Sequence, residues 1–69
     1  MELIVPNNYI LEGLKDFGFK YVKNEKKEVY QNQGIEVDVK TRKVNIVGKA
    51  DPYIILSLYL HGLIDLKAL

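Results

Sequence analysis

The sequence predicts a single α+β domain over residues 1–69. Three observations support this prediction: alternating apolar and polar residues in the middle of the chain, an amphipathic segment before them, and a mostly apolar segment after them. Alternation is typical of a strand with one buried face, whereas apolar residues spaced three and four apart are typical of a helix. A chain of 69 residues is long enough for one hydrophobic core and no second domain.

The first helix is predicted from an N-cap at Asn7 or Asn8 to Phe17, because asparagine side chains readily accept the first free main-chain N–H groups of a helix. Gly18 follows where a left-handed residue commonly ends a helix, which places Phe19 against the last helical turn. The apolar stripe of this helix consists of Ile10, Leu11, Leu14 and Phe17.

Residues 19–23 and 27–32 are predicted to form two strands joined by a polar loop at 24–26. After a turn at residues 32–34, a second hairpin is predicted with its tip at residues 41–42, so that Val39 lies opposite Val44 and Val37 opposite Ile46. In this register the large aliphatic side chains all point toward one buried face. They are Ile35, Val37, Val39, Val44 and Ile46.

The second helix is predicted to begin at Pro52, with Asp51 as its N-cap, and to end before Gly62. Residues 53–60 are apolar except for Ser57, so this helix is apolar on nearly every side. A helix of this kind needs cover on more than one face.

The two ends of the chain resemble each other at an offset of 44 residues, since Leu14 and Gly18 match Leu58 and Gly62. Each half therefore has the order strand, helix, glycine, strand, with residues 3–5 and 44–47 as entering strands. We expect an antiparallel sheet with two helices on one face, a ferredoxin-like (split βαβ) plan with an extra hairpin. The alternative is an α-ββββ-α meander in which residues 1–5 and the C-terminal residues 63–69 are not strands.

Residues 34–69 resemble the second half of a heavy-metal-associated domain. The likeness rests on Gly34-Ile-Glu-Val-Asp-Val-Lys-Thr-Arg-Lys-Val-Asn-Ile-Val-Gly-Lys-Ala-Asp-Pro52 and the helix that follows. The resemblance implies a ferredoxin-like fold. It implies no metal site, because Val5-Pro6-Asn7-Asn8-Tyr9 stands where the family carries its Met-x-Cys-x-x-Cys loop.

Composition limits the functions to consider. The chain has no cysteine, which excludes disulfides and thiolate sites and favours a reducing, cytoplasmic location. Ten Lys and Arg against nine Asp and Glu give a net charge of +1, so no overall field attracts nucleic acid or anionic lipid. Residues 1–5 are too short for a signal peptide and the apolar run 53–60 is too short to span a membrane. We expect no targeting segment and no membrane partner.

No combination of residues is typical of catalysis. His61 is the only histidine, and its place near a helix end favours contact with the last carbonyl groups. Ser57, His61 and Asp65 are spaced four apart, but no oxyanion loop accompanies them, so we interpret the spacing as coincidence. Glu36 and Asp38 are predicted to lie on a solvated strand face. We therefore expect no catalytic residue, no metal and no cofactor, and we interpret the chain as a non-enzymatic interaction module.

The first candidate site is the surface of the second helix, which a domain of this size can hardly bury completely. We expect it to bind a protein partner or a second copy of the chain, as in a homodimer. The alternative is that the first helix, the sheet and the C-terminal residues cover it between them. The candidate interface residues are Tyr53, Leu56, Tyr59, Leu60 and Leu63.

The second candidate site is a basic rim, which would make the chain a nucleic-acid-binding accessory protein. Alternate turns of an antiparallel meander emerge at the same end of a sheet, so cations beside two turns can gather there. Tyr21 and Tyr30 are the aromatic residues that could stack on bases, although we expect both in the core. The rim residues are Lys23, Lys26, Lys27, Lys40, Arg42 and Lys43.

Overall fold

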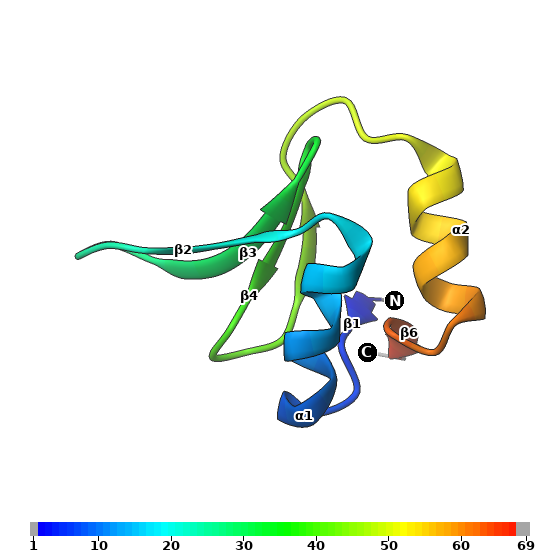
Figure 1. The fold of residues 1–69 in the computed structure, drawn as a ribbon, viewed down its shortest axis with the longest axis horizontal. Helices are drawn as coiled ribbons and strands as arrows, with labels where there is room; N and C mark the ends of the chain where they lie inside the picture. Colours follow the sequence, from blue (N-terminus) through cyan, green and yellow to red (C-terminus); the bar gives the residue numbers. More distant parts are fainter. Residues whose placement is uncertain (1, 68–69) are drawn as a thin grey trace.

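The computed structural model describes residues 2–67 and has an α+β fold. The elements, in chain order, are β1 (Glu2–Ile4), α1 (Asn8–Leu11), the 3-10 helix η1 (Glu12–Phe17), β2 (Lys20–Lys23), β3 (Glu28–Asn32), β4 (Ile35–Asp38), β5 (Val44–Ile46), α2 (Pro52–Leu60) and β6 (Asp65–Lys67). Both helical segments lie on the same side of the sheet that β2 to β5 form (Figure 1).

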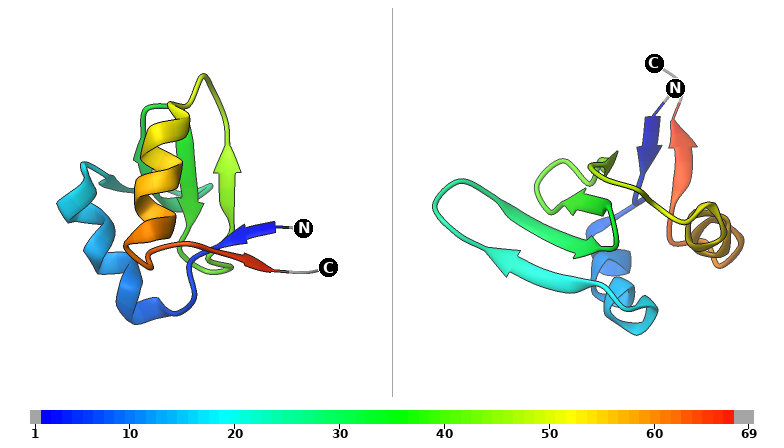
Figure 2. Two further views of the ribbon diagram at one scale, coloured as in Figure 1. Left: turned by 90° about the vertical axis from the view of Figure 1, so that its right-hand side faces the viewer. Right: turned by 90° about the horizontal axis from the view of Figure 1, so that it is seen from above.

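The strands of the described residues form two antiparallel sheets instead of the single sheet that was predicted. Strands β2, β3, β4 and β5 form a meander, and β1 pairs with β6. The two sheets meet at one bridge between Ile4 and Lys43, beside which the Val5 N–H donates to the Arg42 carbonyl at 2.8 Å. Figure 2 shows the β1–β6 ribbon crossing one end of β5. On the Arg42 side of the bridge the pairing ends at Pro6, which has no N–H to donate.

The β1–β6 ribbon shows that the alternative meander without terminal strands was wrong in that respect. The opposed residues are Glu2 with Lys67, Leu3 with Leu66, and Ile4 with Asp65. Residues 68–69, which the predicted C-terminal segment included, lie outside the described residues.

The first helix begins and ends as predicted, but it changes from an α-helix to a 3-10 helix after Leu11. The Asn7 side chain accepts the Ile10 N–H at 3.0 Å, and after Gly18 (φ 86°) the Phe19 N–H donates to the Leu14 carbonyl at 3.2 Å. Between these caps, residues 12–17 form a 3-10 helix, where a continuous α-helix was predicted. This run contains Gly13, which has a low preference for the α-helical conformation.

The second helix repeats this capping pattern at the same offset of 44 residues. The Asp51 side chain accepts the Tyr53 N–H at 2.9 Å, and beyond Gly62 (φ 77°) the Leu63 N–H donates to the Leu58 carbonyl at 2.9 Å. Both helices thus end in a Schellman motif, in which a left-handed glycine turns the next residue back toward the helix. The internal repeat in the sequence is therefore a repeat of local structure.

The β4–β5 hairpin forms, but its register is two residues away from the predicted one. Val37 lies opposite Val44 and Ile35 opposite Ile46, so the connection runs from residue 39 to residue 43. Because the shift is even, the same side chains still share a face. Ile35 and Val37 are fully buried, but Ile46 is 50% exposed, which corrects the prediction that it points into the core.

The Asp38 side chain explains the longer connection. Its Oδ1 accepts the N–H groups of Lys40 at 2.8 Å and Thr41 at 2.9 Å, and the Arg42 N–H donates to the Asp38 carbonyl at 2.8 Å. Arg42 takes a left-handed conformation (φ 62°) that closes the turn. The side-chain cap of Asp38 stabilises this longer connection. It therefore competes with the two-residue tip at 41–42, which the pairing of aliphatic side chains alone would favour.

One hydrophobic core joins both helical segments to the inner face of the meander. Leu14 from η1 and Leu58 from α2 are both fully buried, and they belong to the same cluster as Ile35 and Val37 from β4. The buried residues of this cluster are Val5, Leu11, Leu14, Phe19, Tyr30, Ile35, Val37, Leu58, Leu63 and Ile64.

Gly34 and Gly62 allow the effect of backbone conformation to be separated from the effect of close packing. Both have positive φ, but a Cβ on Gly34 would lie 3.0 Å from main-chain carbons of Gly48 and Lys49, whereas a Cβ on Gly62 would meet nothing within 4 Å. We expect Gly62→Ala to lower the free energy of unfolding by about 1 kcal/mol and Gly34→Ala to lower it by clearly more. Urea denaturation of both variants measures the difference, and equal losses would contradict this description of the turn.

The Asp38 cap makes a pH-dependent contribution to stability. Hydrogen bonds from the main-chain N–H groups of Thr41 and Lys40 hold the pKa of Asp38 below its ordinary value of 3.8. Because this pKa is lowered in the folded state, the contribution is present above the ordinary pKa and disappears as the pH falls through the folded-state pKa. We expect the difference in unfolding free energy between wild type and Asp38→Ala to be constant near neutral pH and to shrink in acid. Glu25→Ala is the control, and a constant difference down to the lowest pH would rule out this role.

Candidate functional site

The outward face of α2 is uncovered in the part of the chain that the structure describes. Tyr53 is 77% exposed, Leu60 71%, Leu56 51% and Tyr59 46%. The opposite face of the helix carries Leu58, which is fully buried. Four of the five predicted interface residues therefore lie together on the surface of one helix.

Leu63, the fifth predicted interface residue, lies in the core with only 8% of its surface exposed, so its prediction as a surface residue was wrong. One of its methyl carbons lies 3.2 Å from the position that a Cβ on Gly13 would occupy, which places it against η1. The reason is the left-handed turn at Gly62, which directs the following residue inward. The repeat contained this signal, because Phe19 follows Gly18 and is buried in the same way.

An apolar groove continues the exposed face of α2 toward the β1–β6 ribbon. The groove has a volume of about 280 Å³. Sequence reasoning missed its strand side, because Leu66 belongs to a short C-terminal segment with weak alternation. Leu66 is 50% exposed. The groove is lined by Leu3, Pro52, Ile55, Leu56, Tyr59, Ile64 and Leu66.

Three of the six predicted basic-rim residues are engaged by groups within the chain. Lys27 pairs with Glu36 at 2.6 Å and Lys43 with Glu2 at 3.4 Å. The Arg42 Nε donates to the carbonyl of residue 5 at 3.0 Å. Figure 1 shows the β2–β3 turn at the far left and the β4–β5 turn lower and nearer the middle of the view. The two turns emerge at the same end of the meander, where the Val39 N–H donates to the Glu28 carbonyl at 3.1 Å.

The two tyrosines beside the rim pack on each other, with ring centroids 5.4 Å apart. Tyr30 is buried in the core, as predicted, but Tyr21 is 44% exposed, which corrects the prediction that both are core residues. The Tyr21 hydroxyl donates to the Glu28 carboxylate, and this hydrogen bond raises the pKa of Tyr21 above its ordinary value. A carboxylate at this position repels the phosphates of a stacked nucleotide.

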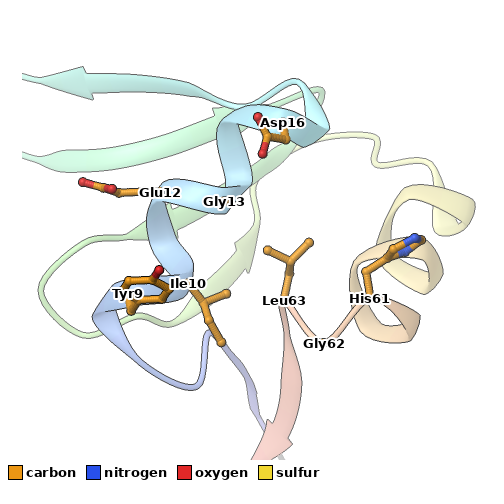
Figure 3. Close-up of a pocket in the computed structure, with 8 residues that line it drawn as sticks. All are labelled: Tyr9, Ile10, Glu12, Gly13, Asp16, His61, Gly62 and Leu63. Carbon is orange, nitrogen blue, oxygen red and sulfur yellow. The ribbon is translucent and has the colours of Figure 1, made fainter.

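A second hollow, of about 480 Å³, lies between the first helix and the end of α2. Figure 3 shows Glu12 directed away from Leu63, with His61 on the other side of that leucine. The polar groups that line this hollow therefore do not converge on a common point. Across residues 2–67, no group of three or more His, Cys, Asp or Glu is arranged to hold a metal ion. The lining residues are Tyr9, Ile10, Glu12, Gly13, Asp16, His61, Gly62 and Leu63.

His61 caps the end of α2, as the sequence predicted. Its Nδ1 lies 2.8 Å from the main-chain carbonyl oxygen of Ser57, to which the ring N–H donates. The imidazole also makes an edge contact with the Phe17 ring, with centroids 5.2 Å apart. Residues 17 and 61 are equivalent in the internal repeat, so this contact joins the ends of the two helices.

None of the helices in residues 2–67 has the length and apolar character needed to cross a lipid bilayer. No protein-family model matches the chain, and comparisons with curated proteins and with solved structures also find no match.

Leu60 and Leu63 provide a direct test of which leucine belongs to the surface. We expect Leu63→Ala to lower the free energy of unfolding by about 2–4 kcal/mol, because it leaves a cavity in the core. Leu60→Ala removes a side chain that is mostly in water, so we expect a loss of less than about 1 kcal/mol. Urea denaturation of the two variants measures both values. A larger loss for Leu60→Ala would place the boundary of the core elsewhere.

Proposed function

We propose that the chain is a cytoplasmic, non-enzymatic interaction module that self-associates through the outward face of α2. The observation that carries this proposal is the exposure of Tyr53, Leu56, Tyr59 and Leu60 on one helix. Together with Leu66 they present on the order of 500 Å² of apolar surface, near the upper end for a monomeric protein. A patch of this size is often functional, which supports a partner-binding role.

A second copy of the chain is the partner that fits this surface best. A stable interface buries about 800 Å² on each partner, of which the α2 face supplies more than half. In a twofold dimer the same patch meets itself, so apolar surface is covered on both copies at once. The net charge of +1 produces little repulsion between two copies.

We prefer self-association to the nucleic-acid hypothesis on electrostatic grounds. Lys27 and Lys43 are neutralised by Glu36 and Glu2, and the Glu28 carboxylate binds the tyrosine nearest the rim. Phosphate binding by these groups would require the existing pairs to break. The α2 surface needs no such rearrangement.

The ferredoxin-like plan, and with it the resemblance to heavy-metal-associated domains, also remains a proposal. It is supported by the position of β1, which pairs with β6 on one side and meets the end of β5 at the Ile4–Lys43 bridge on the other. In this interpretation β2 and β3 are the additional hairpin. The repeat of capping motifs in α1–η1 and α2 supports the same plan.

Sedimentation equilibrium over a wide concentration range tests the proposed self-association. We expect wild type to form dimers and the double variant Leu56→Ser/Leu60→Ser to raise the dissociation constant about tenfold or more, because each buried leucine contributes about 1.5–3 kcal/mol when fully covered. Both side chains are at least half exposed, so the monomer fold is retained.

Ile46→Ser/Val47→Ser is the matched control, because these residues on and beside β5 are 50% and 61% exposed but lie outside α2. We expect this control to associate like wild type. A wild type that remains monomeric at millimolar concentration would disprove the proposal, and equal weakening by both double variants would remove α2 as the interface.

A further inference from the structure

Resting on the self-association proposed above, we infer that two copies pair through the outer edges of β6, antiparallel, about a twofold axis at Leu66. Strand β6 pairs with β1 along one edge only, and no other strand of residues 2–67 lies on its second edge. All three of its residues are exposed. An uncovered strand edge is a template for pairing with another chain.

One hydrogen bond indicates which main-chain groups face outward. The Leu66 N–H donates to Oδ1 of Asp65 at 2.8 Å, which places this N–H on the edge turned away from β1. Residues alternate in the direction of their main-chain groups along a strand, so both the N–H and the carbonyl of Leu66 face the open edge. Two copies then exchange a pair of N–H to carbonyl bonds between their Leu66 residues, as antiparallel pairing on a twofold axis requires.

The side chains on either side of Leu66 are complementary under this symmetry. Antiparallel pairing about Leu66 places Asp65 opposite Lys67 of the partner subunit, and Lys67 opposite Asp65 of the partner subunit. Because each copy supplies one acidic and one basic residue, the dimer forms two cross-strand ion pairs. In the monomer the Asp65 carboxylate caps the open N–H group, and pairing replaces that cap with a carbonyl and frees the carboxylate for the lysine.

The same arrangement brings the groove side of α2, which carries Leu56 and Tyr59, into the interface. Leu66 and Ile64 line the apolar groove with Leu56 and Tyr59, so Leu66 points toward the face of the ribbon on which α2 lies. Paired strands lie about 5 Å apart, so the two Leu66 side chains meet directly and the two grooves become one. Strand pairing and helix burial therefore belong to a single interface.

The charge complementarity yields a test that uses the full chain. Asp65→Lys places lysine against Lys67 of the partner subunit, and Lys67→Asp places aspartate against Asp65 of the partner subunit, each twice per dimer. We expect either variant alone to raise the dissociation constant about tenfold. An equimolar mixture of the two variants forms a heterodimer in which both pairs are attractive, so we expect its dissociation constant to return to within about threefold of wild type.

Cross-linking provides a second measurement that does not depend on charge. The chain has no cysteine, so Leu66→Cys introduces a single thiol. Hydrogen-bonded antiparallel partners have Cα atoms about 5.5 Å apart, a separation that a disulfide spans. We expect this variant to form a disulfide-linked dimer on mild oxidation, and the control Tyr9→Cys, at a position that is 91% exposed, to form far less.

The outcomes separate this inference from the proposed function. A wild type that never dimerises overturns both. A dimer that is weakened by Leu56→Ser/Leu60→Ser, yet shows neither recovery in the mixture nor preferential cross-linking at position 66, overturns the β6 pairing and leaves association through α2 intact. Recovery in the mixture together with cross-linking at position 66 supports the twofold axis at Leu66.

Discussion

The packing of Leu14 and Leu58 against the inner face of β4 is the contact on which the rest of the structure depends. Each leucine comes from one copy of the internal repeat, and each is fully buried. Both lie in the last turn of helices that end at a left-handed glycine, so their neighbours Phe19 and Leu63 enter the same core. This arrangement folds the two ends of the chain against the meander, where a short chain must concentrate its apolar side chains to become stable.

The helix α2 is apolar on two faces, and the packing of Leu58 into the core covers only one of them. Leu58 occupies the inner face, and the half-buried Ile54 and Ile55 flank it. Nothing in residues 2–67 packs on the outer face, since the β1–β6 ribbon reaches only the side of the helix that carries Leu56 and Tyr59. The uncovered face of α2 and strand β6 lie side by side, since Leu56, Tyr59 and Leu66 line the same groove.

Much of the candidate surface was predictable from the sequence, because apolar residues all around one helix exceed what a small core can bury. Leu63 was wrongly predicted to lie on the surface. Its side chain points inward because of the left-handed turn at Gly62, which a helical projection of the sequence does not include. Leu66 was missed because a three-residue strand has almost no periodicity, and its partner Leu3 lies at the other end of the chain. The six cations beside the turns were found as a set, but the sequence cannot show which of them meet a carboxylate across the sheet.

Local chemistry in the sequence by itself determined the helix caps at Asn7 and Asp51, the glycine ends, the order of the elements and the alternation of the β4–β5 hairpin, because these features depend on residues within a few positions of one another. The two-residue change of register also has a local cause, because the Asp38 cap over residues 40–42 prevails over aliphatic pairing. Tertiary structure decided the division into two sheets and the pairing of β1 with β6. These features depend on contacts between residues far apart in the chain, whose free energies compete in ways that no local pattern records.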